Sequence, residues 1–288
     1  MATNSIECSI IIPAFNESNV IERCLSKLLE GLDLSRCEII VVANGCKDDT
    51  VEKAQKFPGV QVENIAQASK VAALNTGDKL ARGKFRAYID ADILLSGSAV
   101  ITVLDYLQAN SHIKVAAPKI QFDLSHSSLL VKAFYSVWKS LPYMKDPGLV
   151  GSGVFILSPS GRDSFAEFPA LISDDGYVRT LFRRDERAMV EQCRFTVFAP
   201  NTVADLIKIK TRVRLGNLEL KRASPTAAIG GENTLKAALK TLIVNPWLIP
   251  AAMVYFHVQK QTKTRALIRF KNNEMEKWDR DNGSRANV

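Results

Sequence analysis

Two short clusters of aspartates have the residue types and spacing for metal and proton chemistry. The first is Asp90-Ala91-Asp92, in which two carboxylates stand two residues apart directly after the apolar run 85–89. Such a pair can hold Mg²⁺ or Mn²⁺, because these ions take one or two carboxylates and complete their shell with water and substrate phosphates. An isolated acidic triplet is also common in turns and helix caps, so its place in the fold decides between the two interpretations.

The second cluster is Asp174-Asp175, between Ser173 and Gly176. Two adjacent carboxylates raise each other's pKa, which moves one of them toward the basicity of a general base. The alternative is a cap for a helix that begins near Gly176, because Asp is favoured at helix N-termini.

The first ninety residues alternate between strands and helices, and this pattern decides where the acidic clusters lie. Short apolar runs predict buried strands at residues 8–13, 38–43, 61–64 and 85–89. Apolar residues at helical spacing predict intervening helices at residues 21–29, 51–56 and 71–81. The alternation predicts an α/β fold whose mostly parallel sheet is covered by helices. Ligands bind such sheets at the carboxyl ends of the strands, so we expect one rim at residues 15–16, 43–45 and 90–92.

The rest of the chain is less regular. Residues 115–117 and 153–157 predict strands, and residues 127–138 predict a helix. From Leu206 onward the pattern is helical and basic, and it ends in a polar tail at 278–288 that we expect to be disordered.

Composition narrows the class of protein. The chain has 288 residues and a formal net charge of +8, which fits an anionic ligand, a nucleic acid or an anionic membrane surface. The basic residues are spread out until the last third, so we expect no nucleic-acid partner. Five cysteines without paired spacing favour a reducing, cytoplasmic compartment, and we expect no secretory signal. The longest apolar segment, 242–258, contains two prolines and falls short of the roughly 20 residues of a membrane span.

The order of the motifs resembles that of the family 2 glycosyltransferases. The segments that carry the resemblance are residues 9–17 (SIIIPAFNE), 38–50 (EIIVVANGCKDDT), 70–83 (KVAALNTGDKLARG), 88–92 (YIDAD) and 173–175 (SDD). It is good over about the first hundred residues and looser through Arg187. The resemblance implies a GT-A, Rossmann-like fold and a metal-dependent inverting transfer of a sugar from a nucleotide-sugar donor to a hydroxyl acceptor. The role it implies is in glycan, polysaccharide or glycoconjugate biosynthesis.

The resemblance also implies roles for the residues of the nucleotide half. Those expected to line the nucleotide pocket are Pro13, Ala14, Asn16 and Glu17. Asn44 would approach the base, and Lys70 would lie near the base or the phosphates. The family often carries an acidic pair before Gly45, where this chain has Ala43-Asn44, so the donor stays undecided between UDP- and GDP-linked sugars. The amide oxygen of Asn44 can still accept a hydrogen bond from a base.

The acidic clusters receive their roles in the same way. Asp90 and Ala91 would contact the nucleotide, and Asp90 and Asp92 would hold Mg²⁺ or Mn²⁺. Inverting transfer is a single displacement that needs a general base, which the resemblance places at Asp175, with Asp174 as its support.

The resemblance implies a catalytic domain at 1–205, with a nucleotide-binding half at 1–110 and an acceptor-binding half at 111–205. A helical C-terminal extension and polar tail would follow at 206–288.

Several alternatives stay open. A retaining GT-A transferase or a sugar nucleotidyltransferase shares the fold, although residues 13–17 lack the glycine-rich loop of the latter. A non-catalytic nucleotide-sugar-binding module is a third possibility, disfavoured by four intact aspartates. The turn 151–153 is either a close approach to the sugar or only a tight turn. Arg179 and the arginines at 183, 184 and 187 are interpreted as a solvated basic face.

The acceptor is not identified by the sequence and is expected to be a sugar, a lipid-linked molecule or another small hydroxyl compound. The basic segment 208–222 is interpreted as part of a helical lid. The alternative is peripheral contact with the inner face of the cytoplasmic membrane.

Overall fold

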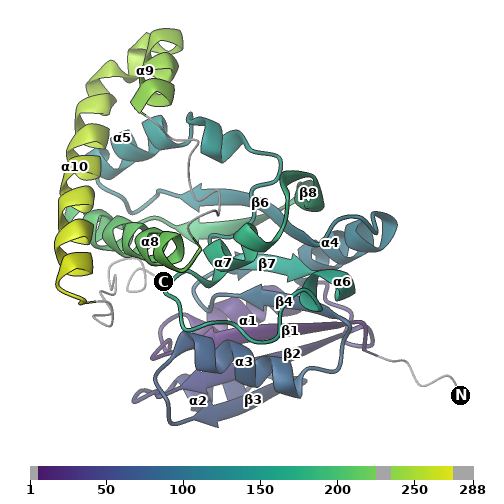
Figure 1. The fold of residues 1–288 in the computed structure, drawn as a ribbon. Coiled ribbons are helices and arrows are strands. Elements are labelled where there is room, and N and C mark those ends of the chain that lie inside the picture. The colour runs from purple at the N-terminus through teal and green to yellow at the C-terminus, as the bar shows by residue number, and fades with distance from the viewer. Residues whose placement is uncertain (1–5, 225–234, 275–288) are drawn as a thin grey trace, which may run out of the picture.

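A single eight-stranded sheet forms the centre of the computed structural model, which describes residues 6–224 and 235–274. The strand order is β3-β2-β1-β4-β7-β6-β8-β5 (Figure 1). The strands of the first half are all parallel: β1 (Cys8–Ala14), β2 (Cys37–Asn44), β3 (Val60–Ile65) and β4 (Phe85–Ile89). The predicted α/β fold and its helix-covered sheet are therefore confirmed, and the chain reverses strand order next to β1, where such sheets bind ligands.

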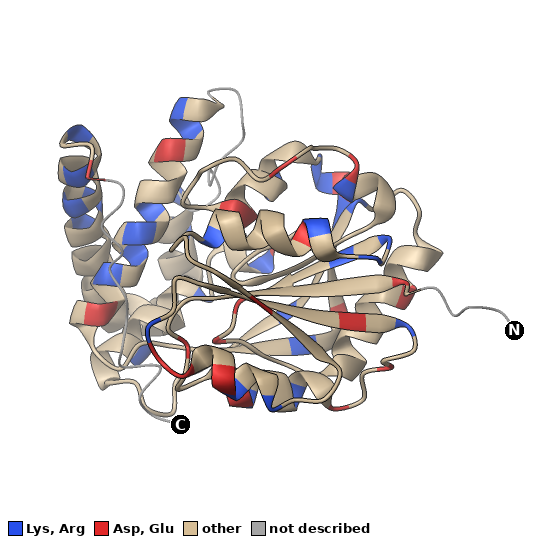
Figure 2. Cartoon of the chain, turned by 90° about the horizontal axis from the view of Figure 1, so that it is seen from below, with Lys and Arg blue, Asp and Glu red and all other residues tan. Residues whose placement is uncertain are grey.

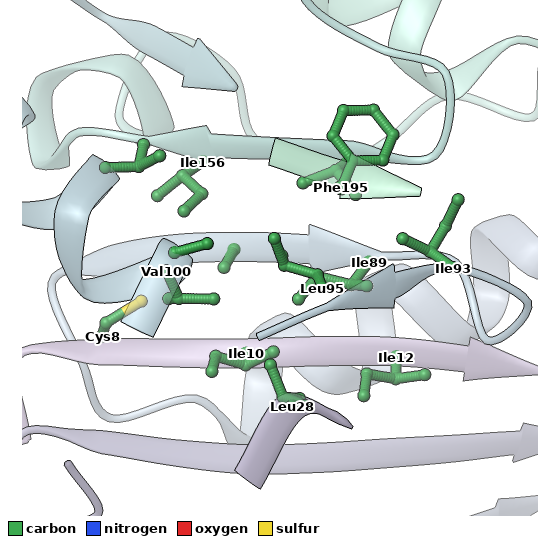
Figure 3. Packing of buried hydrophobic residues seen from close by; sticks show 14 of the residues in the cluster. Cys8, Ile10, Ile12, Leu28, Ile89, Ile93, Leu95, Val100, Ile156 and Phe195 are labelled. Atoms are coloured by element: carbon green, nitrogen blue, oxygen red, sulfur yellow. The ribbon is translucent and has the colours of Figure 1, made fainter. Parts of the chain in front are cut away.

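Alternate residues of the central strands fill two separate cores, because successive side chains of a strand point to opposite faces. Ile10 and Ile12 face a core that includes Leu28 of α1 (Ile21–Leu29) and Val100 of α4 (Gly97–Ala109), as Figure 3 shows. Ile11 faces the opposite core. This two-sided burial accounts for the continuous apolar runs in the sequence.

Helix α3 (Lys70–Leu80) covers the second face and sets the position of Lys70. Ser69 caps the helix, because its hydroxyl accepts from the N–H of Ala72. Gly77 allows α3 to lie against β1, since a Cβ there would stand 2.5 Å from Cγ2 of Ile11. The short helix α2 (Thr50–Gln55) packs against β3.

The second half of the sheet mixes directions. Antiparallel pairs join β4 to β7 (Val154–Leu157) and β7 to β6 (Val115–Asp123), whereas β6 and β8 (Arg187–Phe198) are parallel. The sequence analysis did not predict β8, the edge strand β5 (Leu94–Leu95) or α4. The charged residues within β8 interrupt the apolar run that would predict a strand. The strand is stabilised by its pairing with β6, which the local sequence does not reveal. The remaining elements of this half are α5 (Leu129–Trp138), η1 (Pro142–Lys145), α6 (Pro159–Arg162), α7 (Asp174–Leu181) and η2 (Arg184–Glu186).

The predicted helical C-terminal region is confirmed. It consists of α8 (Val203–Ala223), α9 (Leu235–Val244), η3 (Pro246–Leu248) and α10 (Ile249–Lys271). Helix α10 packs along both α8 and α5, at one side of the sheet (Figure 1). The predicted polar tail, 278–288, lies outside the described residues.

Within the described residues, no helix alone has the length and apolar character to cross a membrane. The segments Lys236–Val244 and Pro246–Lys271 reach that length and composition only together, and they are bent by 116°.

Candidate active site

A cavity of about 710 Å³ opens at the carboxyl ends of β1, β2 and β4 and reaches the C-terminal helices. Its volume lies in the range of roughly 300–1,000 Å³ that is typical of small-molecule sites. The residues singled out from the sequence that line it are Pro13, Glu17, Asn44, Lys70, Asp90, Ala91, Asp92, Asp174 and Asp175. The fold thus brings both acidic clusters to one space.

Ala14 and Asn16 are not among the lining residues, and both tie together the turns that follow β1 and β2. The thiol of Cys46 donates to the carbonyl of Ala14 at 3.3 Å and accepts from the N–H of Asn16 at 3.2 Å. The side-chain oxygen of Asn16 accepts from the N–H of Lys47 at 2.7 Å. Their contacts shape the rim rather than the cavity wall.

Lys70 joins the two acidic clusters. Its Nζ lies 2.7 Å from Oδ1 of Asp90 and 2.9 Å from Oδ1 of Asp174. Burial works against the ammonium charge, but the carboxylates of Asp174 and Asp90 outweigh it and raise the pKa of Lys70 above its usual value. Burial also raises the pKa of Asp90 to about 6, and the ammonium of Lys70 limits that rise.

Asp175 is held by hydrogen bonds at both oxygens. Its Oδ2 accepts from the N–H of Ser152 at 2.9 Å, and its Oδ1 accepts from the hydroxyl of Ser173 at 3.0 Å and the N–H of Gly176 at 2.7 Å. Burial alone would raise the pKa of Asp175, but Lys70 and these donors outweigh burial and lower it. The rise expected from two adjacent carboxylates is therefore wrong for Asp175, which is ionised at neutral pH.

The aspartate pair also lies in the first turn of α7, which begins at Asp174. Acidic side chains are favourable there because the N-terminus of a helix carries partial positive charge. The N-cap residue, Ser173, makes no side-chain capping bond. Asp175 thus helps to stabilise the N-terminus of α7, as the helix-cap alternative predicted. Both carboxylates also line the cavity.

The turn 151–153 contacts both acidic clusters. Its three residues, Gly151, Ser152 and Gly153, have φ values of 116°, 62° and 95°. A Cβ at Gly153 would stand 3.1 Å from Oδ2 of Asp90, whose N–H donates to the Gly153 carbonyl at 2.8 Å. It is therefore a tight turn that holds the carboxylates in place, and Ser152 and Gly153 also face the cavity.

Asp90 and Asp92 are the residues with the chemistry to hold a divalent ion. Both line the cavity at the end of β4. Across residues 6–224 and 235–274, no group of three or more acidic, His or Cys side chains is arranged to hold a metal without help. Two carboxylates with a ligand's phosphates and water nevertheless suit Mg²⁺ or Mn²⁺, so the donor set fits an ion that arrives with a phosphorylated substrate.

Asn44 presents an unused acceptor to the cavity. The residue is buried at the end of β2, and its side-chain oxygen has no hydrogen-bond partner among residues 6–224 and 235–274. A buried polar atom without a partner is costly, and such atoms often mark the place of a ligand group. An N–H of a nucleotide base would satisfy it.

The far wall of the cavity holds residues that the sequence analysis missed or interpreted differently. Arg179 donates to the hydroxyl of Tyr143 at 2.9 Å, and both line the cavity. Arg183 and Arg184 are exposed surface residues that pair with Asp185 and Asp146, so they are solvated as predicted, whereas Arg179 is not. The i,i+4 spacing of Arg179 from Asp175 was the available signal, because it places both on one side of a helix.

The mixed sheet covered by helices, with a cavity at the carboxyl ends of its parallel strands, is the architecture of the GT-A fold. The sequence matches the family model for glycosyl transferase family 2 over residues 9–161, more than half of the chain. The chain therefore belongs to the family 2 glycosyltransferases.

One curated relative is the uncharacterized glycosyltransferase YibD of Escherichia coli strain K12. It is 31% identical over 96 residues, which cover 32% of this chain and 28% of the relative. The chain thus matches less than a third of the length of that relative.

Solved structures support the fold at low identity. The mannosyltransferase PcManGT from Pyrobaculum calidifontis, solved with GDP-Man and Mn²⁺, has a TM-score of 0.61 at 16% identity, covering 93% of this chain and 83% of that one. The glucosyl-3-phosphoglycerate synthase of Mycobacterium tuberculosis, solved with Mn²⁺, UDP and glucosyl-3-phosphoglycerate, has a TM-score of 0.54 at 19% identity, covering 75% and 79%.

Proposed function

We propose that the protein transfers a sugar from a nucleotide-sugar donor to a hydroxyl acceptor, with inversion at the anomeric carbon. The observation that carries this proposal is the ion-paired cluster in which Lys70 joins Asp90 to Asp174, with Asp175 in the same cavity. One group of side chains thereby faces both the strand ends, where a nucleotide would bind, and the space where an acceptor would approach.

The donor end suits a nucleoside diphosphate. The free oxygen of Asn44 is available to a base N–H, and Asp90 and Asp92 would hold Mg²⁺ or Mn²⁺. When bound, the ion would neutralise charge on the leaving diphosphate. Two proteins of the same fold were solved with Mn²⁺ and either GDP-Man or UDP, so we propose a UDP- or GDP-linked sugar as donor.

Asp175 is proposed as the general base. The acceptor oxygen would attack the anomeric carbon on the face opposite the diphosphate, the bond to the diphosphate would break, and the acceptor proton would pass to Asp175. Its lowered pKa keeps the carboxylate ionised, which is the form that accepts a proton, and makes it a weaker base than a free aspartate. Ser152 and Ser173 hold its oxygens, so the carboxylate needs little reorganisation.

Donor hydrolysis tests this proposal without a known acceptor. UDP- and GDP-sugars would be incubated with the protein in Mn²⁺ or in EDTA, and binding would be followed by thermal shift, because a ligand of the native state raises its melting temperature. We expect one donor to bind and to be hydrolysed slowly. Binding without any turnover would instead indicate a non-catalytic module. The anomeric configuration of the released sugar, read by NMR within minutes, separates inversion from retention.

The cellular setting belongs to the same proposal. We propose a cytoplasmic enzyme of glycan, polysaccharide or glycoconjugate biosynthesis, with residues 1–205 as the catalytic domain and peripheral contact with the inner face of the membrane. Support comes from the C-terminal helices, which carry many Lys and Arg residues (Figure 2). Such helices are attracted to anionic lipid surfaces.

A further inference from the structure

The cavity has two chemically different ends. The strand end carries the carboxylates of the acidic clusters. The other end is formed by α5, α8 and α10, and the α8 and α10 residues that line it include three basic side chains and no acidic one. They are Ile209, Lys210, Arg212, Val213, Arg214, Asn217, Tyr255, Gln259 and Thr262. This second end is suited to an anionic group rather than to a metal.

Lys210 is the central cation of the basic end. Its Nζ lies 3.4 Å from the ring centroid of Trp138 and 5.8 Å from the centroids of Phe134 and Tyr135. No carboxylate of the described residues pairs with it, and burial lowers its pKa to about 7. An ammonium held among aromatic rings gains some cation–π stabilisation but keeps its unused N–H donors. An anion entering the cavity would supply the missing partner.

An exposed apolar surface lies at the start of α10 and on the two elements before it, α9 and η3. We call it the elbow, and it comprises the exposed large apolar side chains of α9, η3 and the start of α10: Leu239, Ile243, Val244, Trp247, Ile249 and Met253. Ile243 is 80% exposed and Trp247 is 71% exposed. Exposed large apolar side chains gathered on three consecutive elements indicate an interaction surface.

The charge around the elbow favours an anionic lipid surface as the partner. Residues 235–271 contain no Asp or Glu, and their basic residues are Lys236, Lys240, Lys260, Lys263, Arg265, Arg269 and Lys271. Figure 2 shows the corresponding concentration of Lys and Arg on the C-terminal helices. Lys236 and Lys240 lie beside the elbow on α9, and the other five basic residues lie further along α10, after Met253. An apolar surface with Trp on a basic helical segment that lacks acidic residues is typical of helices that lie in a membrane interface.

Helix α10 connects the elbow to the cavity. Met253 of the elbow precedes Tyr255, Gln259 and Thr262, which line the cavity. At about 1.5 Å of rise per residue, these positions lie roughly 3–14 Å from Met253 along the helix axis. Asp175 and Lys210 therefore line one cavity that α10 borders, and the same helix carries the last residue of the elbow, Met253, on its solvent-facing side.

We propose that the acceptor is a lipid-linked molecule whose phosphate binds at Lys210 and whose apolar chain runs along α10 toward the elbow, which lies in the membrane interface. The inference rests on the proposed function for the acceptor's hydroxyl, which would face Asp175. It assigns Lys210 to acceptor binding and Trp247 to membrane contact. A soluble phosphorylated acceptor would use the first of these sites and not the second.

Binding of model amphiphiles tests the phosphate site without a donor. Farnesyl phosphate, farnesol and inorganic phosphate would be titrated into the full chain by calorimetry. We expect farnesyl phosphate to bind at least about tenfold more tightly than either partial ligand, because only it offers both a charge-assisted hydrogen bond and an apolar chain. Lys210→Met should weaken farnesyl phosphate binding about tenfold. Lys260→Met, an exposed lysine of α10 outside the cavity, is the matched control and should not change it.

Each other result of this titration overturns part of the proposal. Equal binding of farnesol and farnesyl phosphate, with no effect of Lys210→Met, would rule out the phosphate site. Equal binding of inorganic phosphate and farnesyl phosphate would identify a soluble acceptor and overturn the lipid. Nucleotide binding, measured separately by thermal shift, should be the same in wild type and Lys210→Met. A loss of nucleotide binding in wild type would count against the proposed function, whereas a loss of farnesyl phosphate binding alone would count against the acceptor site.

Sedimentation with vesicles tests the elbow. We expect the protein to co-sediment with phosphatidylglycerol vesicles and to bind phosphatidylcholine vesicles much more weakly. The double variant Trp247→Gln/Met253→Gln should lose most of this binding and keep its melting temperature, since both side chains are exposed. Leu34→Gln changes an exposed apolar residue in the turn before β2 and should bind like wild type. Equal loss in both variants, or none in the double variant, would overturn the membrane contact.

Discussion

Gly151 lies so close to Asp175 that a Cβ on the glycine would stand 2.7 Å from Oδ2 of the aspartate. The contact is independent of the hydrogen bond that the next residue, Ser152, donates to the same oxygen. Two features therefore require glycine at position 151. Its φ of 116° is unfavourable for other residues, and the carboxylate of Asp175 occupies the space where a side chain would lie.

Gly151→Ala is accordingly expected to destabilise the fold and displace Asp175. Forcing a side chain into this backbone region costs about 1–3 kcal/mol. The melting temperature and donor hydrolysis should both fall. Gly59→Ala is the matched control, because Gly59 also has a positive φ of 81° but lies outside the cavity. If both variants lose stability and only Gly151→Ala loses turnover, the loss of turnover results from displacement of Asp175 and not from the strained backbone alone.

Asp175→Asn is expected to lower kcat by roughly 10²–10⁴-fold, the usual contribution of a general base. Nucleotide affinity should stay within a few-fold, because the residues proposed to hold the nucleotide lie at the strand ends and do not include Asp175. Asp174→Asn should cost less, since Asp174 acts through Lys70. Steady-state kinetics and calorimetry on both variants check this. Melting temperatures are needed as well, because an amide cannot accept at both positions that the carboxylate uses. Full activity of Asp175→Asn would move the base elsewhere.

Asp92→Asn is expected to weaken metal-dependent nucleotide binding without unfolding the protein. The change removes one of the two carboxylates that suit Mg²⁺ or Mn²⁺. Calorimetry with UDP and GDP, in Mn²⁺ and in EDTA, measures the effect. Asp163→Asn alters an exposed aspartate outside the cavity and should behave as wild type. Affinity in EDTA as high as in Mn²⁺ would remove the metal from the binding step.

Asn44→Leu is expected to reduce nucleotide affinity about tenfold or more, while leaving the stability of the free protein unchanged or higher. The reason is that the Asn44 oxygen lacks a partner in the free protein and would gain one only with the base. Asn64→Leu on β3 makes the same change at an exposed position outside the cavity. Unaltered affinity in Asn44→Leu would show that the base lies elsewhere.

Lys210→Met is expected to stabilise the protein below pH 7, and the advantage should shrink as the pH rises toward 9. Burial lowers the pKa of Lys210 to about 7, whereas an unfolded lysine titrates near 10.4. Between these values the unfolded state binds one more proton than the folded state, so wild-type stability rises with pH by up to about 1.4 kcal/mol per unit. Urea unfolding of both proteins from pH 6 to 9 measures the difference. A constant difference would show that Lys210 stays charged when folded.

The nucleotide half was predictable because local sequence determines its elements. The run 85–89 matches β4 residue for residue, and the predicted strand at 8–13 differs from β1 by one residue. These strands are buried on both faces, so they appear as uninterrupted apolar runs. The position of Asp90 and Asp92 followed from the rule for parallel sheets, which needs only the strand ends, whereas Asp174 and Asp175 were placed by the family resemblance.

The acceptor side was less predictable because its elements depend on distant partners. Strand β8 contains Glu191 and Arg194 and is defined by its pairing with β6, which has an irregularity after Pro118. The contact of Lys210 with the ring of Trp138 joins α8 to α5, and no local sequence pattern links these two residues. The bridging role of Lys70 was likewise hidden, since Asp174 lies 104 residues further along the chain.

The ion pair between Lys70 and Asp174 has a consequence for the order of folding. Strand β1 pairs with β2 across 29 residues of chain (Cys8 with Cys37) and with β4 across 77 (Cys8 with Phe85), whereas the ion pair spans 104. Loop closure costs free energy that grows with the logarithm of loop length, and contacts between distant residues form slowly. We therefore expect the ion pair to form after β1 has paired with β2, which closes the shorter loop. A chain in which only residues 1–110 had folded would keep strands β1 to β4 and would lack Asp174 beside Lys70.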